Sequence, residues 1–334
     1  MTDFTLDRMF AARRRIAGIA DHTPLVPSAL GDRFGHELLL KLEIAQPVGA
    51  FKLRGAVNAV FSLEGTPEGV TCCSTGNHGR GVAFAARARG IPAIVCMSNL
   101  TPEAKIAGVR ALGAEARIIG QSQDDAQKEA ARLVAEEGLT EISPFDDADV
   151  IAGQGTIGLE LLEARPDLDT ILVPLSGGGL AGGVAFAAKT INPKIRVIGI
   201  TMDRGAAMHA SLQAGHPVEV TEVASLADSL GGGIGMQNRL SFPLCRDYLD
   251  DVVLVSETEI YRALQTIYYE DRIVCEGACV VGIAALQSGK ISLTGPTATI
   301  ITGRNLDMTM HAQIMAGEDV HLGDLTVEGS AYAP

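Results

Sequence analysis

Short runs of β-branched and other apolar residues recur along the chain and alternate with longer stretches that carry helical patterns. The apolar runs predict strands, and they lie at residues 38–42, 69–73, 93–97, 116–119, 170–173, 197–200, 252–255 and 297–301. Strands that read as continuous apolar runs are typical of parallel sheets that helices cover on both faces. The alternation therefore predicts an α/β fold with mainly parallel sheets.

Several of the predicted helices have recognisable ends. Thr101 is an N-cap followed by proline, and Gly113 ends the helix that starts there. A second helix is predicted over residues 122–137, before Gly138. Ser256 opens the capping box Ser-Glu-Thr-Glu of a further helix that runs to about residue 269.

The order of these elements suggests two α/β units. Residues 72–148 hold consecutive strand–helix repeats and are predicted to form a small domain. Residues 1–71 together with 149–320 are predicted to form a larger one. The C-terminal tail, residues 321–334, is acidic and poor in large apolar residues, so we expect it to be loosely packed or to contact another subunit.

Composition narrows the class of protein. The chain has 334 residues, of which 47% are hydrophobic and 20% charged, as in a globular protein. Its net charge of −13 argues against a nucleic-acid-binding surface. No apolar run approaches the roughly 20 residues that span a bilayer, and the polar first 15 residues show no secretory signal. We therefore expect a cytoplasmic protein that binds neither nucleic acid nor membrane.

The six cysteines lie mostly in apolar, strand-like stretches. This placement indicates buried, reduced thiols rather than a disulfide framework. Cys275 and Cys279 have neither a second cysteine pair nor a nearby histidine, so a zinc site is not expected.

Lys52 stands in the segment Gly-Ala-Phe-Lys-Leu-Arg-Gly-Ala, residues 49–56. Burial in an apolar stretch lowers the pKa of a lysine, because it disfavours the ammonium form. A neutral lysine amine can form a Schiff base with an aldehyde such as pyridoxal phosphate (PLP). The plainer alternative is a surface lysine whose stem covers apolar neighbours.

A glycine-rich segment, Leu-Ser-Gly-Gly-Gly-Leu-Ala-Gly-Gly at residues 175–183, follows a predicted strand and opens a helix. Backbone N–H groups at such a helix start bind phosphate. The alternative is a turn whose glycines serve close packing only. The segment lacks the Gly-Lys-Ser/Thr of a P-loop, and it has no acidic partner for a dinucleotide fingerprint apart from Asp203.

Two further segments end predicted strands with polar groups. Residues 74–78, Ser-Thr-Gly-Asn-His, gather hydroxyl, amide and backbone donors that could bind a carboxylate, with Asn77 able to reach a phenolic oxygen. His78 is equally compatible with a structural role at a helix start. Thr302 follows the last predicted strand and offers one hydroxyl.

Together these segments resemble the fold-type II PLP enzymes, the tryptophan synthase β-like family of threonine dehydratases, serine dehydratases and serine racemases. The resemblance covers about residues 20–310, and residues 150–157 (Val-Ile-Ala-Gly-Gln-Gly-Thr-Ile) are a further hallmark of it. It implies two three-layer α/β/α domains with PLP as the cofactor. By resemblance, the Schiff-base residue is Lys52, and the cofactor is further contacted by Phe51, Asn77, Ser176, Gly177, Gly178, Gly179 and Thr302.

The same resemblance implies the substrate contacts. Lys52 and Thr75 are the expected catalytic residues. The expected substrate-binding residues are Ser74, Thr75, Gly76, Asn77, His78 and Gln123. Relatives that bind a cation have a glutamate where this chain has Thr201, so no metal is expected, although Asp203 lies close by.

The hydroxyl of Thr302 limits which types of reaction are favoured. A neutral hydroxyl cannot stabilise a protonated pyridine as a carboxylate would, which favours β-elimination over a long-lived carbanion. We therefore expect a 3-hydroxy amino acid to give a 2-oxo acid and ammonia. Residues 203–209 and 227–233 most resemble the hydroxyectoine-utilization dehydratases, which suggests a catabolic role, and we expect a homodimer.

Two other functions are compatible with these residues. An amino-acid racemase would use Lys52 and Thr75 as acid and base on opposite faces of the substrate. A non-catalytic nucleotide-binding or sensory protein could retain the glycine-rich segment without the chemistry.

Overall fold

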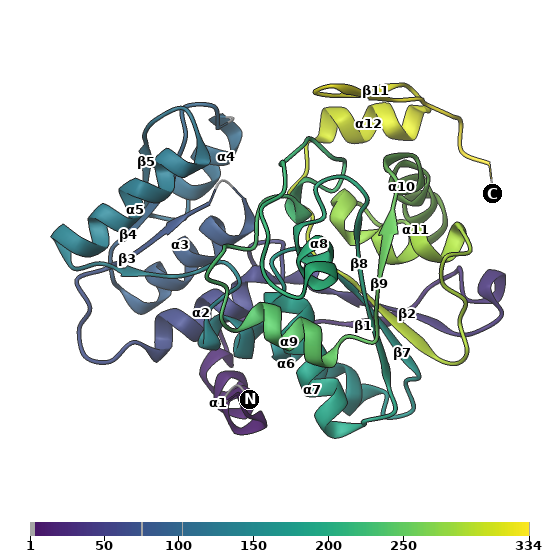
Figure 1. The fold of residues 1–334 in the computed structure, drawn as a ribbon, viewed down its shortest axis with the longest axis horizontal. Helices are drawn as coiled ribbons and strands as arrows, with labels where there is room; N and C mark the ends of the chain where they lie inside the picture. The colour runs from purple at the N-terminus through teal and green to yellow at the C-terminus, as the bar shows by residue number, and fades with distance from the viewer. Residues whose placement is uncertain (1–3, 75, 102, 334) are drawn as a thin grey trace.

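Two mainly parallel sheets organise the computed structural model (Figure 1). It describes residues 4–74, 76–101 and 103–333, apart from the side chains of residues 104 and 123. The larger sheet has six strands in the order β1 (Leu25–Pro27), β2 (Leu38–Leu42), β10 (Thr297–Ile301), β7 (Thr170–Pro174), β8 (Arg196–Met202) and β9 (Asp251–Val255). Within it only β1 runs antiparallel to its neighbour. The smaller sheet has four parallel strands in the order β5 (Glu115–Ile118), β4 (Ala93–Met97), β3 (Val70–Cys73) and β6 (Thr140–Glu141).

Helices cover both sheets. They are α1 (Leu6–Ile16), α2 (Lys52–Ser62), α3 (Asn77–Arg89), α4 (Glu103–Arg110), α5 (Gln123–Glu137), α6 (Ala148–Ala164), α7 (Gly179–Ile191), α8 (Ala207–Ala214), α9 (Ser241–Tyr248), α10 (Glu257–Asp271), α11 (Val281–Gln287) and α12 (Met308–Ala316). Short 3-10 turns lie at η1 (Asp32–Phe34), η2 (Glu43–Ala45), η3 (Asp228–Leu230) and η4 (Gly277–Cys279). No helix among the described residues is long and apolar enough to cross a membrane.

Alternate residues of the strands enter different cores. Leu38 and Leu40 of β2 pack with α10 and α11 on one face, whereas Leu39 packs with α6 and α7 on the other. Both faces of the larger sheet are therefore buried, as the continuous apolar runs predict. The α/β fold with mainly parallel sheets is confirmed, and the predicted strands coincide with observed ones to within two residues at each end.

The boundary predicted between residues 71 and 72 falls inside β3, which starts at Val70. Helix α2 precedes this boundary, yet Leu53 and Val57 of α2 share a core with Val70 and Val82 of the small sheet and α3. Part of the first strand of the small sheet and part of its helical cover thus come from residues before 72.

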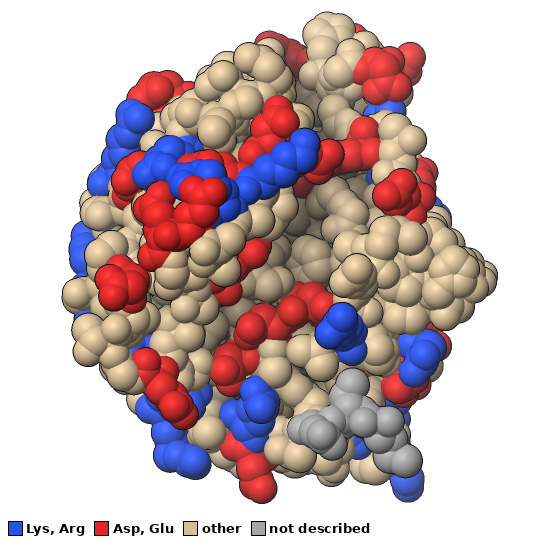
Figure 2. Space-filling model, turned by 60° about the vertical axis from the view of Figure 1, so that its left-hand side comes forward, with Lys and Arg blue, Asp and Glu red and all other residues tan. Residues whose placement is uncertain are grey.

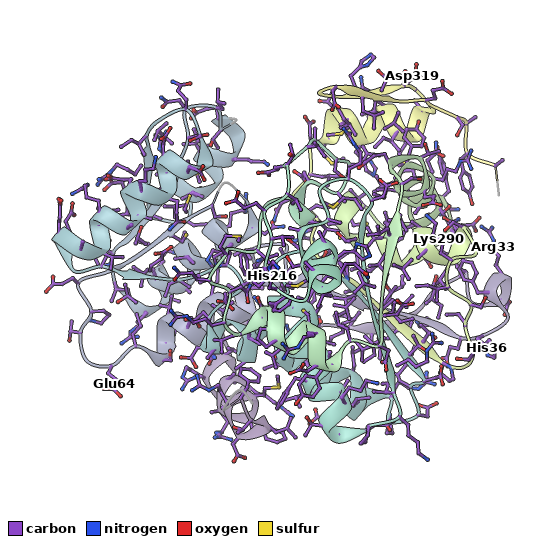
Figure 3. The ribbon with its side chains drawn as sticks, viewed as in Figure 1. Arg33, His36, Glu64, His216, Lys290 and Asp319 are labelled. Atoms are coloured by element: carbon purple, nitrogen blue, oxygen red, sulfur yellow. The ribbon has the colours of Figure 1, made fainter. Side chains whose placement is uncertain are left out.

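The C-terminal segment packs against the large unit rather than lying loosely on it. Strands β11 (Val320–Leu322) and β12 (Leu325–Val327) form a hairpin whose apolar side chains join the main core. Gln265 of α10 donates a hydrogen bond to the carbonyl of Ser330, and Tyr332 stacks on Tyr269 at 4.7 Å. Asp319, labelled beside the hairpin in Figure 3, accepts a hydrogen bond from the N–H of Gly329.

Four charged side chains form a buried cluster behind the start of α2. Arg54 donates to Glu43 at 2.8 Å and to Glu160 at 2.6 Å, and Lys41 donates to Glu160 at 2.5 Å. Arg54, Glu43 and Lys41 are each no more than 1% exposed. Burial alone would raise the pKa of Glu160, but Arg54 and Lys41 hold it below its ordinary value. The cluster joins β2, η2, α2 and α6.

Arg54→Met is expected to lower the free energy of unfolding by about 3–5 kcal/mol, because it leaves two buried carboxylates with only Lys41 to balance them. Urea unfolding followed by circular dichroism measures the change. The matched control is Arg110→Met, since Arg110 pairs with Glu103 at 3.5 Å on the surface, and about 1 kcal/mol or less is expected there. Equal losses in the two variants would contradict a stabilising role for the buried cluster.

Candidate active site

Lys52 is the first residue of α2 and lies where the two α/β units meet. Its Nζ donates a hydrogen bond to the carbonyl oxygen of Pro144 at 2.7 Å and lies 5.4 Å from the ring centre of Phe51. Burial lowers the pKa of Lys52 from 10.5 to about 8. About a tenth of the amine is therefore neutral at pH 7, far more than for an ordinary lysine.

Backbone pairing places Thr302 next to the lysine segment. The N–H of Phe51 donates to the carbonyl of Thr302 at 3.0 Å, and the N–H of Arg304 donates to the carbonyl of Gly49 at 2.9 Å. Gly49 adopts a left-handed φ of 74°, which lets the chain turn into this pairing. Thr302 is 5% exposed. Backbone hydrogen bonds thus hold the end of β10 against the start of α2.

The glycine-rich segment lies at the same edge of the larger sheet as Thr302, because β7 and β10 are adjacent parallel strands. Its carbonyl groups are held by α9: Ser241 donates to the carbonyl of Gly177 at 2.7 Å, and the thiol of Cys245 donates to that of Gly178 at 3.6 Å. Helix α7 begins at Gly179, and the first-turn N–H groups of a helix have no partner within it.

Close packing alone accounts for two of these glycines. A Cβ atom on Gly177 would lie 2.3 Å from the ring of Phe145, and one on Gly179 would lie 2.8 Å from the carbonyl oxygen of Phe145. Pro144, the preceding residue, holds Lys52. The residue pair 144–145 therefore brings the lysine and the glycine-rich segment together, a connection that no sequence motif indicated.

Residues 74–78 follow β3 of the small sheet. Ser74 is half-buried and accepts a hydrogen bond from the N–H of Gly76 at 3.3 Å. Nε2 of His78 donates to the carbonyl of Ile142 at 2.7 Å, since a carbonyl can only accept. Burial lowers the pKa of His78 to about 3, and the nearby positive charge of Lys52 is a smaller cause of the same shift. The ring is neutral and 3% exposed, so direct substrate binding by His78 would use its backbone rather than its ring.

Asn77 is held by a network that the sequence did not reveal. Its Nδ2 lies 3.0 Å from each carboxylate oxygen of Glu276, and its Oδ1 accepts from Asn305 at 2.7 Å. Glu276 also accepts from the hydroxyl of Ser229 at 2.5 Å and from the N–H of Asn305 at 2.8 Å. The carboxylate is 3% exposed. In the sequence, Glu276 stands out only as a single acidic residue within an apolar run.

The two units are joined again at the surface by Lys105 of α4 and Asp228 of η3, which lie 3.7 Å apart. Figure 2 shows a hollow in the middle of the face that it draws, with acidic side chains along its edges. The small and large units therefore contact each other both inside the site, at Asn77 and Glu276, and at its border.

Two of the predicted site residues lie outside what the structure describes. Thr75 is not among the described residues, and the side chain of Gln123, the first residue of α5, is not described. Their proposed roles stay predictions. Among the described residues, no group of three or more His, Cys, Asp and Glu side chains could hold a metal ion.

The remaining groups fit PLP chemically. A lysine of lowered pKa suits an aldehyde, a helix start in a glycine-rich turn suits a phosphate, and the buried hydroxyl of Thr302 suits a ring nitrogen. The amide of Asn77 suits a phenolic oxygen. The backbone pairing, residues 144–145 and the Glu276 network gather these groups around one place between the two sheets.

Comparison with known proteins agrees with this chemistry. The family described as pyridoxal-phosphate dependent enzymes matches residues 16–303. A protein of Sinorhizobium fredii named as a predicted threonine dehydratase is 52% identical over 321 residues, covering 95% of this chain and 97% of that protein. The catabolic L-threonine dehydratase of Escherichia coli K12 is 38% identical, covering 92% and 95%. Maize serine racemase has a similar structure, with a TM-score of 0.88, 34% identity and coverage of 94% and 97%.

The rate at which the cofactor-free protein attaches PLP covalently is expected to rise with pH up to about 8 and to level off above it. Only the unprotonated amine attacks an aldehyde, and the pKa of Lys52 lies below the ordinary 10.5. Stopped-flow absorbance after mixing with PLP measures this rate. N-acetyl-lysine amide serves as the control, whose rate should keep rising to higher pH. The same continued rise in the protein would contradict a buried, activated amine.

Proposed function

The chain belongs to the family of pyridoxal-phosphate dependent enzymes, and we propose that it is an ammonia-lyase that eliminates the β-hydroxyl of a 3-hydroxy amino acid. Its products would be a 2-oxo acid and ammonia. The threonine dehydratases at 52% and 38% identity support β-elimination on hydroxy amino acids. They also favour an enzyme over the non-catalytic nucleotide-binding or sensory protein that the glycine-rich segment allowed.

The observation that carries the proposal is the backbone pairing of residues 49–51, immediately before Lys52, with residues 302–304. PLP, when bound, withdraws electrons from the bond to the substrate Cα proton. In our proposal the amine of Lys52 holds the cofactor and, once displaced by the substrate, accepts the Cα proton. A base with a pKa near 8 is well matched to this transfer at physiological pH.

The other site residues position the reactants. N–H groups of residues 176–179 would bind the cofactor phosphate, Asn77 would donate to its phenolic oxygen, and residues 74–78 would bind the substrate carboxylate. Thr302 would contact the ring nitrogen with a neutral hydroxyl. A neutral hydroxyl would not balance a positive charge on the ring nitrogen. This would favour elimination of the β-hydroxyl over reactions that need a long-lived carbanion.

The finer parts of the proposal rest on the sequence. Residues 203–209 and 227–233 resemble the hydroxyectoine-utilization dehydratases, so we propose a catabolic role and a hydroxyectoine-derived substrate. We also propose a cytoplasmic homodimer. A screen of 3-hydroxy amino acids for ammonia release, including threonine, serine and compounds derived from hydroxyectoine, identifies the substrate. Ammonia release confined to threonine and serine would contradict the hydroxyectoine assignment.

Lys52→Ala is expected to lower lyase activity by roughly 10²–10⁴-fold or more, because it removes both the covalent anchor and the general base. Equimolar release of ammonia and 2-oxo acid is the measurement, together with the visible absorption of the bound cofactor. Lys290→Ala is the control, since Lys290 lies at the outer side of the large unit (Figure 3) and pairs with Glu259 at 2.7 Å. Full activity and unchanged absorption of the cofactor in Lys52→Ala would contradict the proposal.

The racemase alternative is supported by the similarity to maize serine racemase. Chiral chromatography of the remaining amino acid, alongside the 2-oxo acid assay, separates the two reactions. We expect 2-oxo acid to predominate, and Thr75→Ala to reduce any racemisation more than elimination. If the opposite enantiomer is instead the main product and Thr75→Ala abolishes it, racemisation is the principal activity.

A further inference from the structure

Cys279, the last residue of η4, packs directly against Thr302. Its Sγ lies 3.3 Å from the hydroxyl oxygen of Thr302, 3.0 Å from the carbonyl oxygen of Gly303 and 3.1 Å from the nitrogen of Gly303. Cys279 is fully buried, and Thr302 is nearly so. The thiol is thus the immediate side-chain neighbour of the hydroxyl that we assign to the cofactor ring nitrogen.

The hydrogen-bonding capacity of this thiol is already used by other groups. Its single S–H has the carbonyl of Gly303 within reach as an acceptor. Its sulfur also accepts a hydrogen bond from the N–H of Gly303. Sulfur is a weak acceptor even when it is free. A further hydrogen bond from Thr302 to this sulfur would therefore be poor.

Both possible directions of the Cys279 S–H have the same consequence for Thr302. If the thiol donates to Gly303, the hydroxyl of Thr302 faces a weak acceptor whose sulfur is already engaged. If the thiol donates to Thr302 instead, it occupies a lone pair of the hydroxyl oxygen and leaves the O–H pointing elsewhere. In either case the Thr302 proton is better donated to an acceptor within the site.

We propose that Cys279 is a positioning residue whose weakly accepting sulfur leaves the hydroxyl proton of Thr302 free to be donated to the ring nitrogen of PLP. The inference rests on the proposed function, which assigns Thr302 to that nitrogen. It adds that position 279 must not carry a hydroxyl. A hydroxyl there would compete for the Thr302 proton, because oxygen accepts hydrogen bonds better than sulfur.

The test compares Cys279→Ser with Cys279→Ala in protein loaded with PLP that carries ¹⁵N in its ring. The ¹⁵N chemical shift reports whether the ring nitrogen accepts a hydrogen bond. Cys279→Ser should move the shift toward that of Thr302→Val and weaken PLP binding by roughly three- to tenfold, the loss expected for one neutral hydrogen bond. Cys279→Ala should leave the shift near that of the unaltered protein, with PLP binding changed less than in Cys279→Ser.

A purely structural role for the thiol predicts the reverse order, with serine tolerated and alanine harmful, and that result would overturn the inference. Cys72→Ser is the matched control, since Cys72 is an equally buried thiol in β3 of the small sheet, and it should leave the ¹⁵N shift unchanged. If Thr302→Val itself leaves the shift unchanged, the assignment of Thr302 fails and the inference fails with it. A changed shift in Thr302→Val, together with an unchanged one in Cys279→Ser, overturns the inference alone.

Discussion

The buried guanidinium of Arg54 is the constraint on which the site depends. Its ion pairs with Glu43 and Glu160 are made with almost no access to water. Buried charges are tolerated only when they are compensated, so the segments that carry them must come together in one arrangement. Arg54 lies two residues after Lys52 in the first turn of α2. The ion pairs that fix this helix against β2 and α6 therefore also fix the backbone of Lys52.

The second fixed point is the backbone pairing between the residues before Lys52 and those after β10. It sets Thr302 against Phe51 by main-chain hydrogen bonds, which do not depend on either side chain. The spacing between the backbone of the lysine segment and that of Thr302 is therefore set whatever side chains residues 48–50 carry.

Strands and helix starts that depend on local patterns could be predicted from the sequence. Site residues that depend on long-range contacts could not. The strands were found from continuous apolar runs, and the helix starting after Ser256 was found from a capping box that the structure confirms. Strands β1, β6, β11 and β12 were missed because each is only two or three residues long, too short to give a recognisable apolar run. Glu276 was missed because its partner Asn77 is 199 residues away. The packing of Cys279 on Thr302 is equally invisible in the sequence, since it depends on how η4 meets the end of β10.

The Glu276 network connects the arrangement of the two units to the cofactor site. Asn77 belongs to α3 of the small unit, whereas Glu276, Ser229 and Asn305 belong to the large one. A displacement of α3 from the large unit would take the Asn77 donor away from this buried carboxylate, which costs free energy unless water replaces the hydrogen bond. The amide that we assign to the phenolic oxygen of PLP is therefore correctly oriented only when the two units are together.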